Sequence, residues 1–277
     1  MKIANVDGRA AIVLDGDKEI ADVATASGGR FGADPMEVFA RWDEVAQWGR
    51  TVTTGTAALD TSLLRNPVPA PRQVFAIGLN YRSHAEESGM QVPSVPATFT
   101  KFPASLAGPF ADIEVVGPAI DWEVELVVVI GRLADRVSEA DGWAHVAGLA
   151  VGQDVSDRQL QFAAGAQFSL GKSRRGYGPI GPWIVTPDEL ADRDDLGIGC
   201  SVSGEVMQHG RTSDLIFNVP RLVAELSAVL PLLPGDVIFT GTPEGVGAAR
   251  KPPRFLQAGD VVESWIDGIG TIRNRCV

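Results

Sequence analysis

The chain of 277 residues has few cysteines and no long hydrophobic run, and both shortages restrict its class. Its two cysteines, Cys200 and Cys276, form neither a CxxC pair nor a disulfide framework. The longest apolar run, around Leu126 to Ile130, has the length of a strand rather than of a membrane-spanning helix. Residues 1–7 lack the long apolar segment of a signal peptide. We therefore expect a cytoplasmic protein that does not enter a membrane.

Positive charge is also scarce. The chain has 24 Lys and Arg against 35 Asp and Glu, a formal net charge of −11, which argues against a general nucleic-acid partner or an anionic membrane surface. Three familiar motifs are missing as well: the P-loop GxxxxGK[ST], a GxGxxG between a strand and a helix, and the nucleophile elbow GxSxG. Their absence argues against a nucleotide-binding fold and against a serine hydrolase.

Length and composition set the domain organisation. A hydrophobic content of 45% is enough for a large core. The first 24 residues alternate and turn like a small antiparallel sheet, with Asp7-Gly8 and Asp15-Gly16 as hairpin signals. Helix-like spacing follows over Pro35 to Trp48, and then three alternating prolines form a stiff connector. These signals predict a small N-terminal α+β domain over residues 1–66, a connector over 67–73 and a main domain over 74–277.

The main domain is predicted to be mixed α/β and rich in strands. Glycines and prolines separate many short apolar runs, without the regular strand–helix alternation of a doubly wound fold. One helix is predicted from about Ser213 to Val229, with Ser213 or Thr212 as its N-cap. The predicted strands are Val74–Ile77, Thr98–Lys101, Glu123–Ile130, Val146–Gln153, Ile198–Val202, Asp236–Thr240 and Val261–Ile266.

Two carboxylates lie at the start of a predicted buried strand. Glu123 and Glu125 are two residues apart, so they share one face of that strand. Like charges beside an apolar run are unfavourable unless a cation neutralises them, and hard divalent cations prefer carboxylate oxygens. The spacing alone leaves two interpretations open, a metal site or a frayed strand end with solvated glutamates. A third carboxylate, Asp154, ends the strand Val146–Gln153 and favours the metal site.

Two further pairs have helical spacing. If residues 82–88 are helical, His84 and Glu87 lie three residues apart on one face, and a histidine oriented by a carboxylate is a plausible general base. An incidental ion pair on a surface turn is the alternative. Arg158 and Gln161 follow another strand and are one helical turn apart, so they could face a common ligand. We expect His145 to be a core residue and His209 to lie in an exposed turn.

Two glycine-rich segments follow. Residues 171–182 are interpreted as a rigid loop with concentrated positive charge, which is either an anion site or a solvated loop. Its cationic residues are Lys172, Arg174 and Arg175. Residues 240–247, TGTPEGVG, leave a strand, and their glycines let backbone N–H groups approach an oxyanion closely.

Taken together, these segments resemble the fumarylacetoacetate hydrolase family, in the form of its bacterial two-domain members. The resemblance covers about residues 74–275, and the shared order of the segments makes it specific. The matching segments, in chain order, are GLNYRSHAEE, DWEVELVVVIGR, GQDVSDRQLQ, GKSRRGYGPIGPW, GEVMQHGRTSDLIF, LLPGDVIFTGTPEGVG, FLQAGDVVES and IGTIRN.

The resemblance implies a fold of mixed β-sheets rolled around a central metal site, usually in a homodimer. It implies Mg²⁺ or Mn²⁺ as cofactor and a small 2-oxo acid as substrate. The implied metal ligands are Glu123, Glu125 and Asp154. The implied catalytic residues are His84, Glu87 and Lys172. The implied substrate-binding or site-organising residues are Arg158, Gln161 and Thr242, with Tyr81, Lys101 and Ser105 as further pocket-lining positions.

The chemistry implied by the resemblance is cleavage of a C–C bond in a 2,4-dioxo acid, such as an acylpyruvate, through a metal-stabilised enolate. Two alternatives use the same site: isomerisation of 2-hydroxyhepta-2,4-diene-1,7-dioate and decarboxylation of oxaloacetate. Fumarylacetoacetate hydrolases carry a further metal-site aspartate ahead of the histidine, and Val74–Gly78 has no carboxylate, so a three-carboxylate site is expected. We also hypothesise that Arg174 or, in particular, Arg175 meets a second substrate carboxylate.

Overall fold

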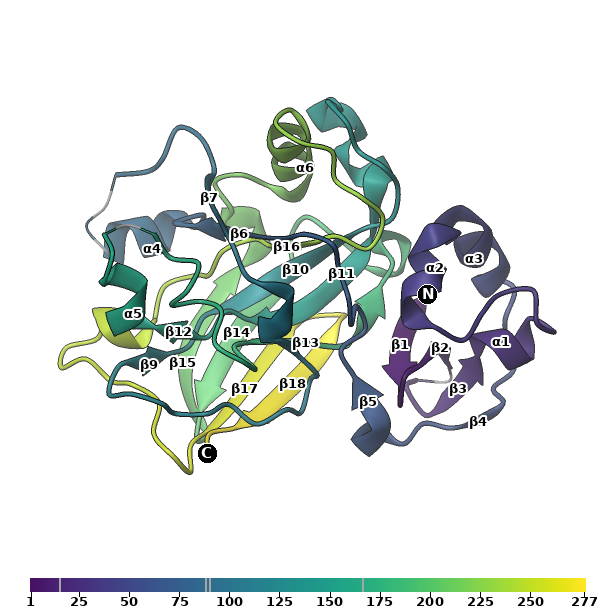
Figure 1. Cartoon of the computed structure of the whole chain (residues 1–277), viewed down its shortest axis with the longest axis horizontal. Helices are drawn as coiled ribbons and strands as arrows, with labels where there is room; N and C mark the ends of the chain where they lie inside the picture. The colour runs from purple at the N-terminus through teal and green to yellow at the C-terminus, as the bar shows by residue number, and fades with distance from the viewer. Residues whose placement is uncertain (15, 88, 90, 166) are drawn as a thin grey trace.

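The computed structural model describes residues 1–14, 16–87, 89, 91–165 and 167–277. In these residues the chain forms one large mixed sheet, a four-stranded antiparallel sheet and a two-stranded ribbon, with short helices at the edges (Figure 1). This is the β-rich mixed α/β class that the sequence predicts. None of the helices in the described part of the chain has the length and apolar character needed to cross a bilayer.

The large sheet has the strand order β4-β3-β2-β1-β13-β11-β10-β16-β6-β7, with β5 beside β1 and β8 beside β13. Its pairs are antiparallel except for β16 with β6 and β13 with β8. Its strands are β1 (Lys2–Val6), β2 (Arg9–Leu14), β3 (Glu19–Asp22), β4 (Ala57–Ala58), β5 (Leu64–Arg65), β6 (Val74–Gly78), β7 (Ala97–Thr100), β8 (Leu106–Ala107), β10 (Val124–Ile130), β11 (Val146–Gln153), β13 (Gly178–Val185) and β16 (Val237–Phe239).

The four-stranded sheet has the order β15-β14-β17-β18 and packs against the middle of the large sheet. One hydrophobic core joins the two sheets, since side chains of β10 and β11 lie in the same cluster as those of β14 and β17. The remaining strands are β14 (Gly197–Val202), β15 (Glu205–Arg211), β17 (Val261–Ile266) and β18 (Gly270–Arg275), and the ribbon is β9 (Ile120–Asp121) with β12 (Ser156–Asp157).

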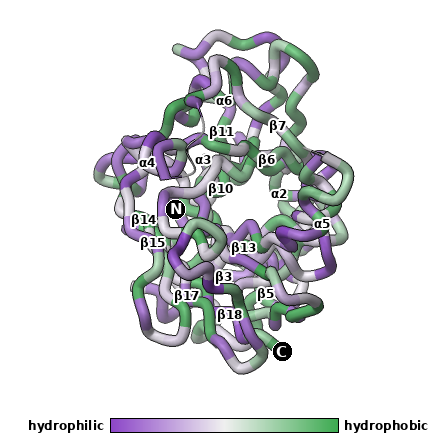
Figure 2. The backbone as a smooth tube through the Cα atoms, turned by 90° about the vertical axis from the view of Figure 1, so that its left-hand side faces the viewer, coloured by the Kyte–Doolittle hydropathy of each residue, from purple (hydrophilic) through white to green (hydrophobic). Residues whose placement is uncertain are grey.

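The helices are short and lie outside the sheets. The 3₁₀ turn η3 packs against α6, and Figure 2 shows α4 as a hydrophilic segment. The α-helices are α1 (Val23–Ala26), α2 (Pro35–Ala40), α3 (Trp42–Gly49), α4 (Arg82–Glu87), α5 (Arg158–Phe162) and α6 (Val219–Ser227). The 3₁₀ turns are η1 (Thr61–Leu63), η2 (Pro103–Ser105), η3 (Glu139–His145), η4 (Pro187–Glu189), η5 (Thr212–Asp214) and η6 (Gly247–Ala249).

The N-terminal segment shares the large sheet with the rest of the chain. Residues Asp7 and Gly8 both have positive φ, 48° and 85°, and form the predicted tight turn between β1 and β2. Asp15, part of the second hairpin signal, lies outside the described residues. Because β1 also pairs with β13, the N-terminal strands continue the main sheet. One sheet therefore spans the predicted connector at residues 67–73, and the domain boundary there stays a prediction.

The structure corrects two helix predictions. The predicted helix over Pro35–Trp48 is two helices, because the chain leaves helical geometry at Arg41. The helix predicted from Ser213 begins instead at Val219, where the Asn218 side chain accepts a hydrogen bond from the Arg221 backbone N–H. Thr212 and Ser213 lie in a separate 3₁₀ turn.

Three of the longer strands were missed, besides five strands of two residues each. Strand β13 occupies the second part of the segment that was interpreted as a loop. It was missed because glycines and the prolines Pro179 and Pro182 usually break a strand. Its pairing with β11 shifts register between Leu149 and Val151, so the prolines fit without a regular ladder. The other two are β15 and β18, both in the four-stranded sheet. His209 lies exposed on β15 rather than in a turn.

Candidate metal centre and active-site cavity

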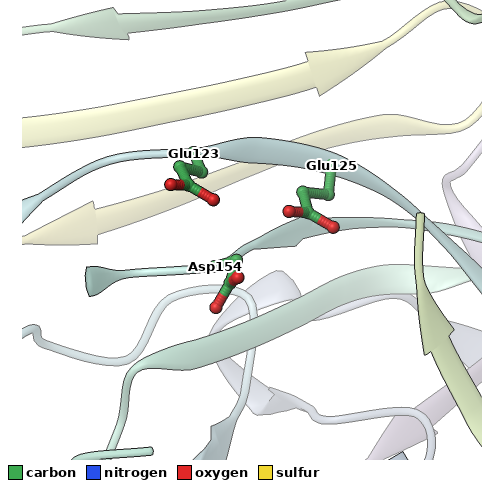
Figure 3. Close-up of side chains that lie close together, drawn as sticks. All are labelled: Glu123, Glu125 and Asp154. Carbon is green, nitrogen blue, oxygen red and sulfur yellow. The ribbon is translucent and has the colours of Figure 1, made fainter. Parts of the chain in front are cut away.

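Three carboxylates meet where β10 begins and β11 ends. Antiparallel pairing sets Val124 opposite Gln153, so the residues flanking this pair, Glu123 and Asp154, become neighbours. The backbone N–H of Asp154 donates to the Glu123 carbonyl at 2.9 Å. Glu123 and Glu125 point from the same face toward Asp154, and ligand oxygens of all three lie within 4.8 Å of one another (Figure 3). The structure thus brings together the three predicted metal ligands.

The three carboxylates are buried, and their environments differ. Burial opposes the charge of Glu123, but Lys172, Arg158 and His84 nearby hold its pKa below the ordinary value. Burial raises the pKa of Glu125 well above the ordinary value, and the negative charges of Asp154 and Glu123 raise it further. The hydrogen bond to Glu125 is from the Gly241 backbone N–H at 2.7 Å. Glu125 is therefore the carboxylate whose charge most needs an added cation.

Lys172 bridges two of the carboxylates from the cavity side. Its ammonium nitrogen lies 2.6 Å from Glu123 Oε2 and 2.8 Å from Asp154 Oδ2. Burial lowers the pKa of Lys172, but the charges of Asp154 and Glu123 outweigh burial, so the net shift is upward and the ammonium stays charged. Lys172 also lines the cavity, as expected of a residue that contacts substrate.

Lys101 was predicted to line the pocket, but the structure places it outside the lining. Its ammonium is fully buried, lies 2.6 Å from Asp154 Oδ1, and also donates to the carbonyls of Lys172 and Tyr177. Burial lowers the pKa of Lys101, opposed by the Asp154 carboxylate. Lys101 is outside the cavity lining, and its hydrogen bonds join Asp154 to the backbone of the Lys172 segment.

Arg158 and Gln161 form the neighbouring wall, on α5. The Arg158 guanidinium contacts Asp121 Oδ2 at 2.7 Å and Glu123 Oε1 at 2.8 Å, and it donates to Gln161 Oε1 at 3.0 Å. Asp121 in turn accepts the backbone N–H groups of Gly247 and Ala248. Sequence reasoning missed Asp121 as a site residue, although it lies in the same motif as the two glutamates.

Counting these groups supports a divalent cation. Four buried carboxylates, Asp121, Glu123, Glu125 and Asp154, face the three cations Lys101, Arg158 and Lys172. With all of them ionised, one negative charge remains, and it has no other counter-ion in this network. An all-oxygen donor set with a residual negative charge fits Mg²⁺ or Mn²⁺.

Thr242 is part of the hydrogen-bonded frame behind the cavity. Its hydroxyl donates to the Val124 carbonyl at 2.8 Å and accepts from Gln208 Nε2 at 2.7 Å. Gln208 also accepts from the Val124 backbone N–H. These bonds tie the segment after β16 to the start of β10. Gln208 was not predicted, because its strand was missed.

His84 and Glu87 lie on α4 as the spacing predicts. His84 Nδ1 is 3.3 Å from Glu87 Oε2, and Glu87 also accepts the Gly245 backbone N–H at 3.1 Å. Both side chains line the same cavity as Lys172 and Arg158. The preceding Leu79 has a φ of 54°, a conformation unfavourable for a branched side chain, at the turn from β6 into α4.

The remaining predicted residues lie outside the cavity lining. Tyr81 is fully buried, its hydroxyl has no hydrogen-bond partner among the residues that the structure describes, and burial together with Glu125 raises its pKa. The Ser105 hydroxyl donates to the Phe102 carbonyl and closes the turn η2. Arg175 is exposed, and Arg174 pairs with Asp157 at 2.8 Å. The hypothesis that either arginine meets a substrate carboxylate has no support in this arrangement.

The cavity has a volume of about 340 Å³, the size of a small-molecule site. It is lined by Glu123, Lys172, Arg158, Gln161, Thr242, His84 and Glu87 among its polar residues, and by three phenylalanines and several aliphatic side chains among the others. Residues 73–277 match the family described as fumarylacetoacetate (FAA) hydrolase, C-terminal. The chain belongs to the fumarylacetoacetate hydrolase family.

Several family members are similar over most of their length. The human mitochondrial oxaloacetate tautomerase FAHD2A is 44% identical over 215 residues, 76% of this chain and 68% of that protein. The crystal structure of a Mycobacterium smegmatis protein described as HpcE has a TM-score of 0.95 and 48% identity and covers 100% of this chain and 99% of that chain.

A third member was crystallised with ligands. Maleylpyruvate hydrolase from Sphingobium sp. SYK-6, in complex with manganese(II) and pyruvate, has a TM-score of 0.81 and 28% identity, and covers 100% of this chain and 99% of that chain. These family members carry out different reactions on one fold, so membership in this enzyme family leaves the reaction open.

Proposed function

We propose that this fumarylacetoacetate hydrolase family member is a divalent-metal-dependent enzyme that interconverts the keto and enol forms of a 2-oxo acid. The observation that carries this proposal is the meeting of two groups at one cavity. Glu123 of the carboxylate triad lines it with Lys172, and so does the His84–Glu87 pair. A cationic centre and a histidine base at one cavity are what enolisation requires. The oxaloacetate tautomerases at 42–44% identity support the same reaction.

Glu123, Glu125 and Asp154 would hold Mg²⁺ or Mn²⁺. When bound, the cation would supply the positive charge that favours the carboxylate and keto oxygens of a 2-oxo acid and its enolate. Its charge would also turn the single negative charge left in the buried network into a single positive one. A 2-oxo acid with one carboxylate would then neutralise the site.

The side chains divide the remaining work. Because Glu87 accepts at Nδ1, His84 carries its proton there and leaves Nε2 free to take a proton from C3 of the keto form. The enolate oxygen takes a proton from solvent to give the enol, and His84 releases its added proton to solvent; ketonisation runs the same transfers in reverse. Lys172 keeps its charge and lies beside Glu123, where it can donate to a substrate oxygen. The Arg158 guanidinium contacts Glu123 with one terminal nitrogen and Gln161 with the other, and so orients both side chains. Lys101 positions Asp154 from behind.

The test uses the whole chain after removal of metal with EDTA. Oxaloacetate enriched in its enol form is added with and without Mg²⁺ or Mn²⁺, and the ultraviolet absorbance of the enol is followed. We expect the absorbance to decay faster with metal, in proportion to protein concentration, and this acceleration to disappear in Glu125→Gln. Equal decay with and without protein, both for oxaloacetate and for the enol of a monocarboxylic 2-oxo acid such as phenylpyruvate, would overturn the proposal.

Hydrolysis of a C–C bond is the second candidate, and the His84–Glu87 pair favours it. In a 2,4-dioxo acid the same base would deprotonate a water that attacks the distal carbonyl, and the products would be pyruvate and a carboxylic acid. Acetylpyruvate tests this reaction by metal-dependent release of acetate. Release of CO₂ from oxaloacetate would indicate a decarboxylase instead, and conversion of 2-hydroxyhepta-2,4-diene-1,7-dioate would indicate an isomerase.

We also infer a homodimer from the family resemblance. Large apolar side chains remain exposed in the single chain, including Phe102 at 48% and Phe110 at 43%. Single exposed apolar side chains are normal on a monomer, so these two agree with the inference without carrying it. Sedimentation equilibrium of the purified protein would show twice the chain mass if this is right.

A further inference from the structure

We propose that the cavity selects 2-oxo acids whose substituent is apolar and the size of an aromatic ring, over those that carry a second carboxylate. This inference concerns the class of substrate. It rests on the proposed function only because turnover is measured through keto–enol interconversion. It is carried by the wall that continues outward from Lys172.

That wall is a row of three phenylalanine rings. The Lys172 ammonium lies 5.5 Å from the centre of the Phe99 ring. Phe99 and Phe168 meet edge to face with centres 5.8 Å apart, and Phe168 and Phe162 meet in the same way at 5.5 Å. All three rings line the cavity, and Phe162 is 53% exposed at the outer end. A substituent that leaves the cationic end of the cavity therefore meets aromatic surface.

Aliphatic side chains extend the same surface. Ile77 and Leu79, at the end of β6 and just after it, line the cavity, and Val246 lines it beyond β16. A phenyl ring or short alkyl chain is held by such a wall through burial and through edge-to-face contacts. A carboxylate there would lose hydration without gaining a donor, which is unfavourable.

The cations of the cavity are already committed. Among the described residues that line it, the permanently charged cations are Arg158 and Lys172. Arg158 binds Asp121 and Glu123, and Lys172 binds Glu123 and Asp154. Both lie at the carboxylate triad, where the 2-oxo acid head would bind. Arg175, the residue expected to meet a second carboxylate, is exposed and outside the lining.

The charge count leads to the same preference. With a divalent cation added, the buried network has one positive charge in excess, which a single substrate carboxylate neutralises. A second carboxylate would leave an excess negative charge against the phenylalanine wall. The arrangement thus favours monocarboxylic 2-oxo acids with apolar tails.

The kinetic test compares phenylpyruvate with oxaloacetate on the whole, metal-loaded chain, each as its enol. We expect kcat/KM for phenylpyruvate to exceed that for oxaloacetate by about tenfold or more. In Phe168→Ala this ratio should fall by about tenfold, and in Phe162→Arg, at the exposed end of the wall, it should shift toward oxaloacetate. Leu170→Ala is the matched control, because Leu170 is 61% exposed in the same segment and outside the lining.

A binding test separates this inference from the proposed reaction. Benzoylformate and ketomalonate cannot enolise, and they differ in carrying a ring or a second carboxylate. Calorimetry should give a lower Kd for benzoylformate, and Phe168→Ala should reduce that preference. This result would support the inference even if no turnover of either substrate were seen, which would overturn the proposed function alone. Tighter binding of ketomalonate, or a preference unchanged in both Phe168→Ala and Phe162→Arg, would overturn the inference.

Discussion

Two regions of the molecule use ion pairs in opposite ways. In the N-terminal region, pairs such as Arg41 with Glu44 and Arg30 with Glu44 lie on the surface, with side chains 43–52% exposed. At the junction of β10 and β11, Lys101 and Asp154 meet with no exposure at all. Exposed pairs contribute little to stability because water screens them and the side chains lose freedom. Buried pairs bring a large loss of hydration.

This contrast indicates where the functional site lies in the fold. A buried network that leaves one carboxylate, Glu125, without a cationic partner is not explained by stability, since apolar residues of the same volume would serve the core at least as well. It is explained if a divalent cation and an anionic substrate complete it.

Removing one ligand charge should affect activity most. In Glu125→Gln we expect loss of metal-dependent turnover by about 1,000-fold or more.

In the metal-free protein, the same substitution should increase the free energy of unfolding. Because burial and like charges raise the pKa of Glu125, the wild-type free energy of unfolding decreases as pH rises above the ordinary glutamate range. The variant lacks this loss, so it should be about 1 kcal/mol more stable at pH 8 and equal at pH 4.

Urea unfolding of the metal-free wild type and variant at both pH values checks this prediction. A variant that is less stable than wild type at pH 8 would show that Glu125 is not under electrostatic strain.

Replacing the proposed base should separate catalysis from metal binding. His84→Gln is expected to lower kcat by about 100- to 10,000-fold. The increase in melting temperature on adding Mn²⁺ should remain, because His84 is not among the metal ligands. His209→Gln is the matched control, since His209 is exposed on β15. Loss of the Mn²⁺ effect in His84→Gln would place His84 at the metal instead.

Lys101 and Lys2 make the comparison of the two regions direct. Lys101→Met leaves Asp154 and two carbonyls without their buried donor, and should lower the free energy of unfolding by about 3–5 kcal/mol. Lys2→Met removes a part-exposed pair with Asp17 and should change the free energy of unfolding by less than about 1 kcal/mol. Equal effects in urea unfolding would remove the distinction between the regions.

Metal alone should stabilise the folded chain. At a Mn²⁺ concentration of 100 times Kd, the free energy of unfolding should rise by about 2.7 kcal/mol, because the cation binds the folded state. Calorimetric melting with and without metal measures the change. The effect should be absent in Glu125→Gln. A shift of the same size in that variant would indicate binding elsewhere.

The smallest effect is expected at the surface pair of Arg9 and Asp22. Arg9 holds the pKa of Asp22 at about 2, so the charged carboxylate stabilises the fold above the ordinary pKa, and this contribution is lost as pH falls toward 2. Asp22→Asn can still cap α1 and should be about 0.5 kcal/mol less stable at pH 7, after allowance for solvent screening. The difference should narrow below pH 4. A constant difference in urea unfolding would assign it to capping.

Local patterns in the sequence were sufficient for part of the fold. Strands β6, β10, β11 and β14 follow from their apolar runs, because each strand buries most of its residues. Strand β17 follows from its alternation of buried and half-buried residues. Strand β13 did not follow, since its prolines and glycines are breakers unless a neighbouring strand with irregular register accepts them. The start of α6 was wrong because several residues before Asn218 have helix-compatible spacing but lie in a 3₁₀ turn and an extended segment.

Neighbours within one strand or one helix could be read from the order of the residues. The two-residue spacing put Glu123 and Glu125 on one face, and the three-residue spacing brought His84 to Glu87, because strand and helix geometry fix such neighbours. The distant groups that meet them could be identified only from the folded chain. Lys172, Arg158 and Lys101 come from separate segments, and Phe99, Phe162 and Phe168 converge from two. No local periodicity encodes these contacts, because sheet pairing and packing between remote segments create them.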